Sequence, residues 1–68
     1  MHLNLFLAAY TAGNEKNPKL VIIDGWNNKE LYNGTYHSLA ICLKNYEWIS
    51  RTVHSWDLED NTLTIEII

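Results

Sequence analysis

The chain has 68 residues, one cysteine (Cys42) and 47 % hydrophobic residues. These values predict one small domain over residues 1–68 that is too apolar to be disordered. The length excludes a multidomain enzyme. A single cysteine forms no disulfide within the chain, which excludes a disulfide-stapled miniprotein, and no cysteine and histidine have zinc-site spacing, which excludes a zinc module. The net charge of −3, from five basic and eight acidic residues, argues against binding of a nucleic-acid polymer, which needs clustered positive charge.

Residues 2–10 are predicted to form the first strand, because their side chains alternate with a period of two. Leu3, Leu5 and Leu7 would lie on one face, with Phe6 and Tyr10 on the other. Two apolar faces indicate a central strand or one that a second subunit covers, so we expect a homo-oligomer. The apolar run is short and no basic residues precede it, which predicts no signal peptide, no membrane association and a cytoplasmic location.

A buried, β-branched strand is expected over residues 19–23, paired with the first strand and ended by Asp24 and Gly25. The pair Asn33-Gly34 predicts a tight turn, because both central positions of a type I′ turn need positive φ. The residues after this turn fit two patterns. The turn favours a strand over residues 35–43, whereas a stripe at helical spacing predicts a helix over residues 36–46.

The C-terminal third of the chain alternates again. Residues 47–57 are predicted to be a strand that carries Trp48 and Trp56 on one face. A turn follows at residues 59–61, and residues 62–67 form the last strand with three apolar side chains inward: Leu63, Ile65 and Ile67.

The expected fold is therefore all-β, a small antiparallel barrel or curved sheet of five to six strands. The alternative is an α+β fold in which residues 36–46 are helical.

No catalytic constellation is apparent. A nucleophile needs an adjacent base, and Cys42 sits in an apolar run where it is a small core residue. Asp24 ends a strand, and the acids at 59 and 60 lie in a turn. His2, His37 and His54 come from three separate segments and predict no metal site. We expect no enzymatic activity and no cofactor.

The candidate ligand-binding residues combine aromatic stacking area, side-chain amides and positive charge. They are Trp26, Asn27, Asn28, Lys29, Trp48, Arg51, His54 and Trp56. A purely structural alternative stays open: the tryptophans pack in the core or against a second copy, and Arg51 pairs with Glu47 or Glu66.

The turn Gly25-Trp26-Asn27, with Lys29 just after it, follows a predicted strand. It resembles the Gly-Trp-Asn turn of small phage anti-Thoeris proteins. The resemblance spans about five residues, of which Trp26 and Asn27 match position by position. It implies an oligomeric, β-rich protein that sequesters a nucleotide immune signal without degrading it.

The leading hypothesis is a non-enzymatic binding protein of a phage or mobile element. It would act in the host cytoplasm as a counter-defence sponge for a small anionic nucleotide-like ligand. One alternative is an acidic protein that inhibits a host defence enzyme or nuclease, where charge steers a basic partner. Another is a structural or virion accessory subunit.

Overall fold

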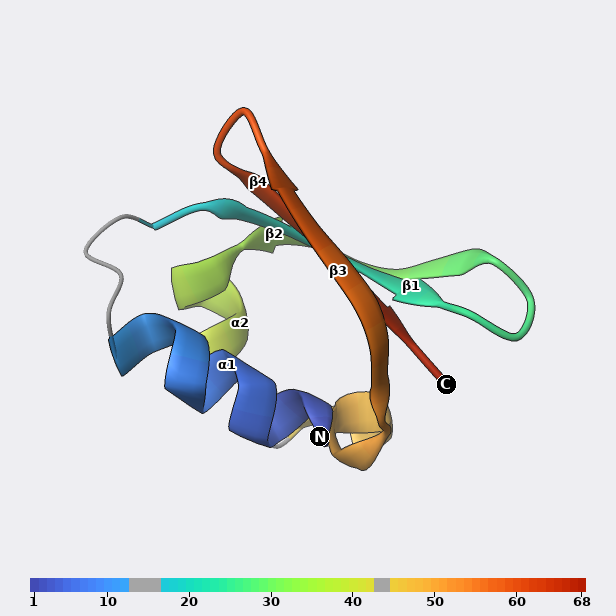
Figure 1. The fold of residues 1–68 in the computed structure, drawn as a ribbon. Helices are drawn as coiled ribbons and strands as arrows, with labels where there is room; N and C mark the ends of the chain where they lie inside the picture. The colour runs from blue at the N-terminus through green and yellow to red at the C-terminus, as the bar shows by residue number, and fades with distance from the viewer. Residues whose placement is uncertain (13–16, 43–44) are drawn as a thin grey trace.

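In the computed structural model, which describes residues 1–12, 17–42 and 45–68, one open sheet has two α-helices against one face (Figure 1). The elements in chain order are α1 (Leu3–Ala12), β1 (Lys19–Asp24), β2 (Lys29–Thr35), α2 (Tyr36–Ile41), the 3₁₀ helix η2 (Glu47–Ser50), β3 (Val53–Glu59) and β4 (Thr62–Ile67). The protein is mostly β, with short helices on one face of the sheet.

The strand order in the sheet is β2-β1-β4-β3. The outer pairs, β1 with β2 and β3 with β4, are antiparallel, whereas the central pair of β1 and β4 is parallel. In this central pair Leu20 lies opposite Leu63 and Ile22 opposite Ile65. The sheet is therefore two hairpins joined side by side, with β2 and β3 as its two edges.

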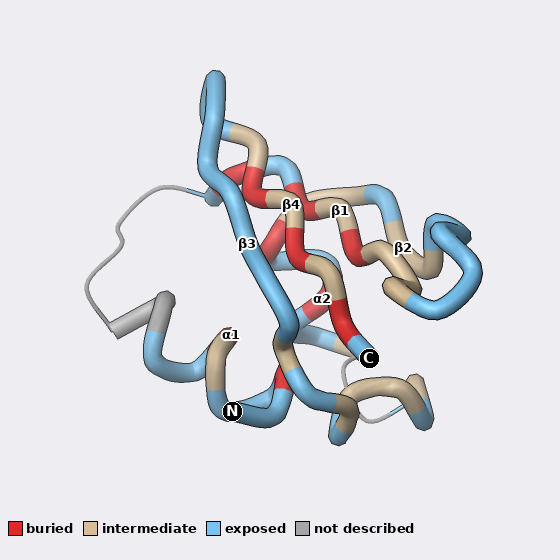
Figure 2. Tube along the Cα trace, turned by 45° about the vertical axis from the view of Figure 1, so that its right-hand side comes forward, coloured by how far each residue is buried: buried red, intermediate tan, exposed pale blue. Residues whose placement is uncertain are grey.

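The core lies between the sheet and the helices. Every second residue of β1 and β4 points into it, since successive side chains of a strand face opposite sides. Figure 2 shows buried positions on the two central strands and on the helices, while β3 is exposed along most of its length. The buried residues of the hydrophobic core are Leu3, Leu7, Leu20, Ile22, Tyr36, Leu39, Leu63, Ile65 and Ile67. The inward positions expected for residues 62–67 are confirmed.

The prediction of a first strand over residues 2–10 is wrong, because this segment is α1. Leu3 and Leu7 are buried one helical turn apart and Phe6 is half-buried beside them, whereas Leu5 is 56 % exposed. The apolar side chains thus meet the core at the helical spacing of three and four residues. The expected hairpin with residues 19–23 is absent, because β1 pairs with β2 and β4.

The prediction of a turn at Asn33-Gly34 is also wrong. Both residues lie inside β2, where Asn33 faces Val21 and Gly34 faces Leu20. A Cβ atom at Gly34 would come within 2.7 Å of the hydroxyl oxygen of Tyr32. Glycine is therefore suited to this position by the close approach of the tyrosine ring, and not by a positive φ.

A helix follows β2 directly, so the alternative that the sequence left open is confirmed for Tyr36–Ile41. The hydroxyl oxygen of Thr35 accepts a hydrogen bond from the Ser38 N–H at 3.2 Å, which is an N-cap. Within the segment 36–46, residues 43 and 44 lie outside the described part of the chain.

The strand expected over residues 47–57 is correct only in its second half. Residues 47–50 form η2, and β3 begins at Val53. The described residues thus form four strands and not five or six, and the sheet is mixed and open instead of an antiparallel barrel.

The expected turn at residues 59–61 is confirmed as the two-residue turn Asp60-Asn61, which joins β3 to β4 with φ values of 50° and 59°. Replacing Asn61 by valine should lower the free energy of unfolding by about 1–2 kcal/mol, because a β-branched residue is strained at positive φ. Urea denaturation measures this loss. The same change at Asn33, which is exposed in β2, serves as the control and should cost almost nothing; equal losses would contradict the assigned turn.

Candidate functional site

The turn between β1 and β2 is held by side chains of its own residues. The Trp26 N–H donates to Asp24 Oδ1 at 2.9 Å, and the Lys29 N–H donates to Asn27 Oδ1 at 3.0 Å. Asn28 takes a positive φ of 59°, which asparagine tolerates better than most residues. These bonds fix the backbone on both sides of Trp26, so its indole projects from an ordered turn.

Arg51 reaches this turn from the segment between η2 and β3. Its two terminal nitrogens lie 3.0 and 3.3 Å from the two carboxylate oxygens of Asp24, which is a paired, charge-assisted contact. The expectation that Arg51 pairs with Glu47 or Glu66 is wrong. Glu66 pairs instead with His54, whose Nδ1 atom lies 3.0 Å from Glu66 Oε1.

The Arg51 guanidinium holds the pKa of Asp24 below its usual range, and the hydrogen bond from the Trp26 N–H lowers this pKa further. Asp24 therefore stays ionised to lower pH than an ordinary aspartate does. The contact also orients the guanidinium beside the turn. Arginine has five N–H donors and Asp24 takes two, so Arg51 can bind another acceptor at the same time.

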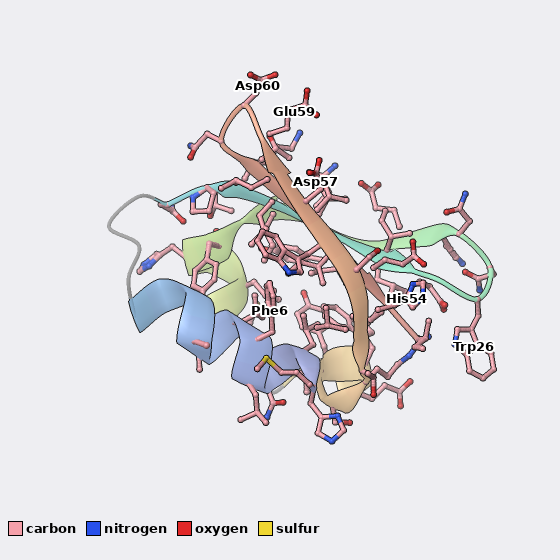
Figure 3. The ribbon with its side chains drawn as sticks, in the orientation of Figure 1. Phe6, Trp26, His54, Asp57, Glu59 and Asp60 are labelled. Atoms are coloured by element: carbon pink, nitrogen blue, oxygen red, sulfur yellow. The ribbon has the colours of Figure 1, made fainter. Side chains whose placement is uncertain are left out.

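An open hollow of about 340 Å³ lies at this place, lined by Asp24, Trp26, Asn27 and Arg51. The Trp26 side chain is 80 % exposed, and Figure 3 shows it projecting from the turn at the edge of the molecule. The hollow offers an aromatic face, an amide and a guanidinium. This combination suits a planar ligand that carries hydrogen-bond acceptors.

The structure brings together only some of the residues that the sequence suggested. Trp26, Asn27 and Arg51 line the hollow, and exposed Lys29 lies directly opposite Asp24 at the start of β2. Asn28 is exposed in the same turn.

The other three candidates lie elsewhere. Trp48 is half-buried in η2 and stacks on Tyr46 with ring centroids 4.7 Å apart. Trp56 lies in β3, with its ring centroid 5.6 Å from that of Phe6. The exposed side chain of His54 contacts Glu66. The shared face expected for Trp48 and Trp56 is wrong, because η2 interrupts the alternation.

Asp24 is the lining residue that sequence reasoning missed. Its place at the end of a predicted strand does not single it out, although arginine is well suited to a partly buried pair with a carboxylate. Asp24 and Arg51 are far apart along the sequence. The one signal for their contact was the expectation that Arg51 pairs with an acidic residue.

In the described ranges, no group of three His, Cys, Asp or Glu side chains is placed to hold a metal ion. No helix within the part of the chain that the structure describes has the length and apolar character needed to cross a bilayer.

Comparison with known proteins adds no relative. The chain matches no family model, and no curated protein and no solved structure gives a significant match.

The Asp24–Arg51 pair predicts a pH dependence of folding. Because the pKa of Asp24 is lower in the folded protein than in the unfolded chain, the pair stabilises the fold above about pH 4, and this contribution is lost as the pH falls through the folded pKa. The urea midpoint should therefore fall as the pH is lowered below about 4. In Asp24→Asn, which keeps an oxygen for the Trp26 N–H, the midpoint should start lower at pH 6 and fall less.

Asp57→Asn is the matched control, since Asp57 is exposed and forms no ion pair among the described residues. This variant should keep the acid dependence of the unsubstituted protein. A pH profile of Asp24→Asn that matches the unsubstituted protein would contradict a contribution of the ion pair to stability.

Proposed function

We propose that this protein is a non-enzymatic binding protein that holds a small anionic ligand of the nucleotide class in the hollow at the β1–β2 turn. The observation that carries this proposal is the exposed indole of Trp26 beside the oriented guanidinium of Arg51. A small domain gains most by burying its large aromatic side chains, so an ordered turn that presents one to solvent favours a role in recognition.

The chemistry of the lining assigns a part to each residue. The base of the ligand stacks on the Trp26 ring, a contact open to any nucleobase because each has a π face. The Asn27 amide nitrogen donates to an acceptor on the base or the ribose, since its oxygen is already used by Lys29. Arg51 and Lys29 supply donors and positive charge to a phosphate.

The resemblance of this turn to the anti-Thoeris proteins suggests what the binding is for. Under this proposal, a phage or mobile-element protein sequesters a nucleotide immune signal in the host cytoplasm. The lining is consistent with sequestration: its one carboxylate, Asp24, is held in an ion pair and is not available as a general base.

A homo-oligomer remains a prediction. Residues 2–10 do not supply a strand with two apolar faces for a second subunit to cover, because this segment is α1. The small size of the core in a chain of this length still favours association with a second copy.

Calorimetric titration tests the proposal. The panel contains a mononucleotide, its nucleoside, ADP-ribose, a cyclic ADP-ribose and a cyclic dinucleotide. We expect at least one nucleotide to bind with one site per hollow, and the nucleoside, which lacks phosphate, to bind more weakly. Recovery of the intact ligand by mass spectrometry supports sequestration. Turnover of the ligand, or no binding by any member at millimolar concentration, would overturn the proposal.

A further inference from the structure

Among the described residues, the outer edge of β3 is unpaired over most of its length. At its beginning the N-terminal segment covers it, because the Val53 N–H donates to the Met1 carbonyl at 2.8 Å and the Leu3 N–H donates to the Arg51 carbonyl at 2.9 Å. Beyond Val53, no strand in the described segments pairs with this side. An unpaired edge presents backbone donors and acceptors that can receive another strand.

The backbone groups that point outward can be assigned from the hairpin. Glu59 and Thr62 flank the two-residue turn and pair with each other. In such a hairpin the residues next to the turn exchange hydrogen bonds, and alternate residues direct theirs away. The outward groups are thus those of Trp56 and Leu58.

The same two residues leave the core incomplete. Trp56 lies opposite Ile65 and Leu58 opposite Leu63, so their side chains share the core face with two fully buried residues. Nevertheless, Trp56 is 54 % exposed and Leu58 is 48 % exposed. A further strand at this edge would extend the apolar rows that already run across the sheet.

The opposite face of β3 is acidic. Asp57, Glu59 and the turn residue Asp60 are exposed, and Figure 3 shows them along β3 and its turn, on the side away from α1. None of the three belongs to an ion pair in the described ranges, where the paired carboxylates are those of Asp24 and Glu66. The free carboxylates make this edge attractive to positive charge.

In the register that places Trp56 of one copy opposite Leu58 of the other, these charges disfavour a second copy of the chain as the occupant. If two β3 edges paired antiparallel, with Trp56 of one copy meeting Leu58 of the other, Asp57 would lie directly opposite Asp57. Like charges directly opposite each other destabilise a strand pair. Acidic residues in an edge strand thus hinder self-association while they favour a basic strand.

We propose that the β3 edge binds an extended segment of a partner protein in which basic residues alternate with apolar ones. The segment adds a fifth strand: its backbone pairs with Trp56 and Leu58, its apolar side chains cover theirs, and its basic side chains meet Asp57 and Glu59. This is strand addition, in which backbone bonds supply affinity and alternate side chains supply specificity. The site is separate from the nucleotide hollow and does not depend on it.

Fluorescence anisotropy with three labelled peptides tests the proposal. Each has about seven residues, the length of β3: one alternates lysine with valine, one has the same composition in blocks, and one alternates glutamate with valine. We expect the alternating lysine peptide to bind at least tenfold more tightly than the other two, and to weaken with added salt. Methylation of alternate backbone nitrogens should abolish its binding. Equal binding of the block peptide, or of the methylated one, would overturn strand addition.

Reversal of the acidic charges on β3 gives a second test of the proposal. The variant Asp57→Lys/Glu59→Lys should prefer the glutamate peptide, and because both positions are exposed the fold should persist, as circular dichroism would verify. Glu30→Lys reverses an exposed carboxylate on the opposite edge, β2, and should leave the preference for lysine unchanged. An unreversed preference, or a dimer of the unsubstituted protein that Trp56→Ala dissociates, would overturn the proposal. Nucleotide titration of the same variants keeps the two proposals distinguishable.

Discussion

Replacing Ile65 by alanine is expected to leave a large fraction of the protein molecules unfolded at 25 °C. Ile65 is fully buried in β4, between Ile22 on one side and Trp56 on the other. Truncation of a buried isoleucine to alanine costs about 2–5 kcal/mol, because apolar contacts are lost and a cavity remains. A core in a domain this small supplies only roughly 3–5 kcal/mol. The loss is therefore comparable to the whole stability.

Urea denaturation followed by circular dichroism measures this effect, with Ile41→Ala as the matched control. Ile41 is 72 % exposed at the end of α2, and alanine suits a helix, so this variant should change the free energy of unfolding by less than about 0.5 kcal/mol. An Ile65→Ala protein as stable as the control would show that β4 does not lie at the centre of the core.

Replacing Trp26 by alanine is expected to reduce nucleotide affinity at least tenfold and to leave stability almost unchanged. This prediction rests on the proposed function. Stacking of a base on an aromatic ring contributes about 1–3 kcal/mol, or about one to two orders of magnitude in the dissociation constant. The exposed indole contributes little to the core, and the turn retains its bonds through the backbone of residue 26.

Trp56→Ala removes a tryptophan that lies outside the hollow and should bind the nucleotide normally. Trp26→Phe, which keeps an aromatic face, should recover part of the affinity that alanine loses. If Trp56→Ala weakened nucleotide binding more than Trp26→Ala, the ligand would have to bind at β3 and not at the β1–β2 turn.

The sequence predicted those parts of the sheet in which local pattern and tertiary contacts agree. In β4 the strict alternation places Leu63, Ile65 and Ile67 toward the core, and residues 59–61 supply the turn before it. Both features depend on neighbouring residues alone. The aromatic turn around Trp26 was likewise found from composition, because tryptophan, asparagine and lysine occur together there.

Prediction failed where one pattern fits two structures. Residues 2–10 fit a strand with two apolar faces, yet Leu3, Phe6 and Leu7 also have helical spacing, and only packing against the sheet decides between the two. Gly34 illustrates a second limit. The same glycine that favours a turn can serve a strand when a neighbouring ring, here that of Tyr32, needs its space.

The contact between Asp24 and Arg51 shows a third limit. Its two residues come from the end of β1 and the segment before β3, and they meet only because the two hairpins lie side by side. No local pattern carries that information. The sequence could name Arg51 as a candidate and predict an acidic partner, but it could not identify which acid.

The parallel pairing of β1 with β4 has a consequence for the order of folding. Each hairpin forms from neighbouring residues, whereas the pairing of Lys19 with Thr62 closes a loop of more than half the chain. Closing a long loop costs entropy before its contacts repay it, and an isolated hairpin is at best marginally stable in water. We therefore expect neither hairpin to be stable alone, and the meeting of the two hairpins along the β1–β4 pairing to limit the rate of folding.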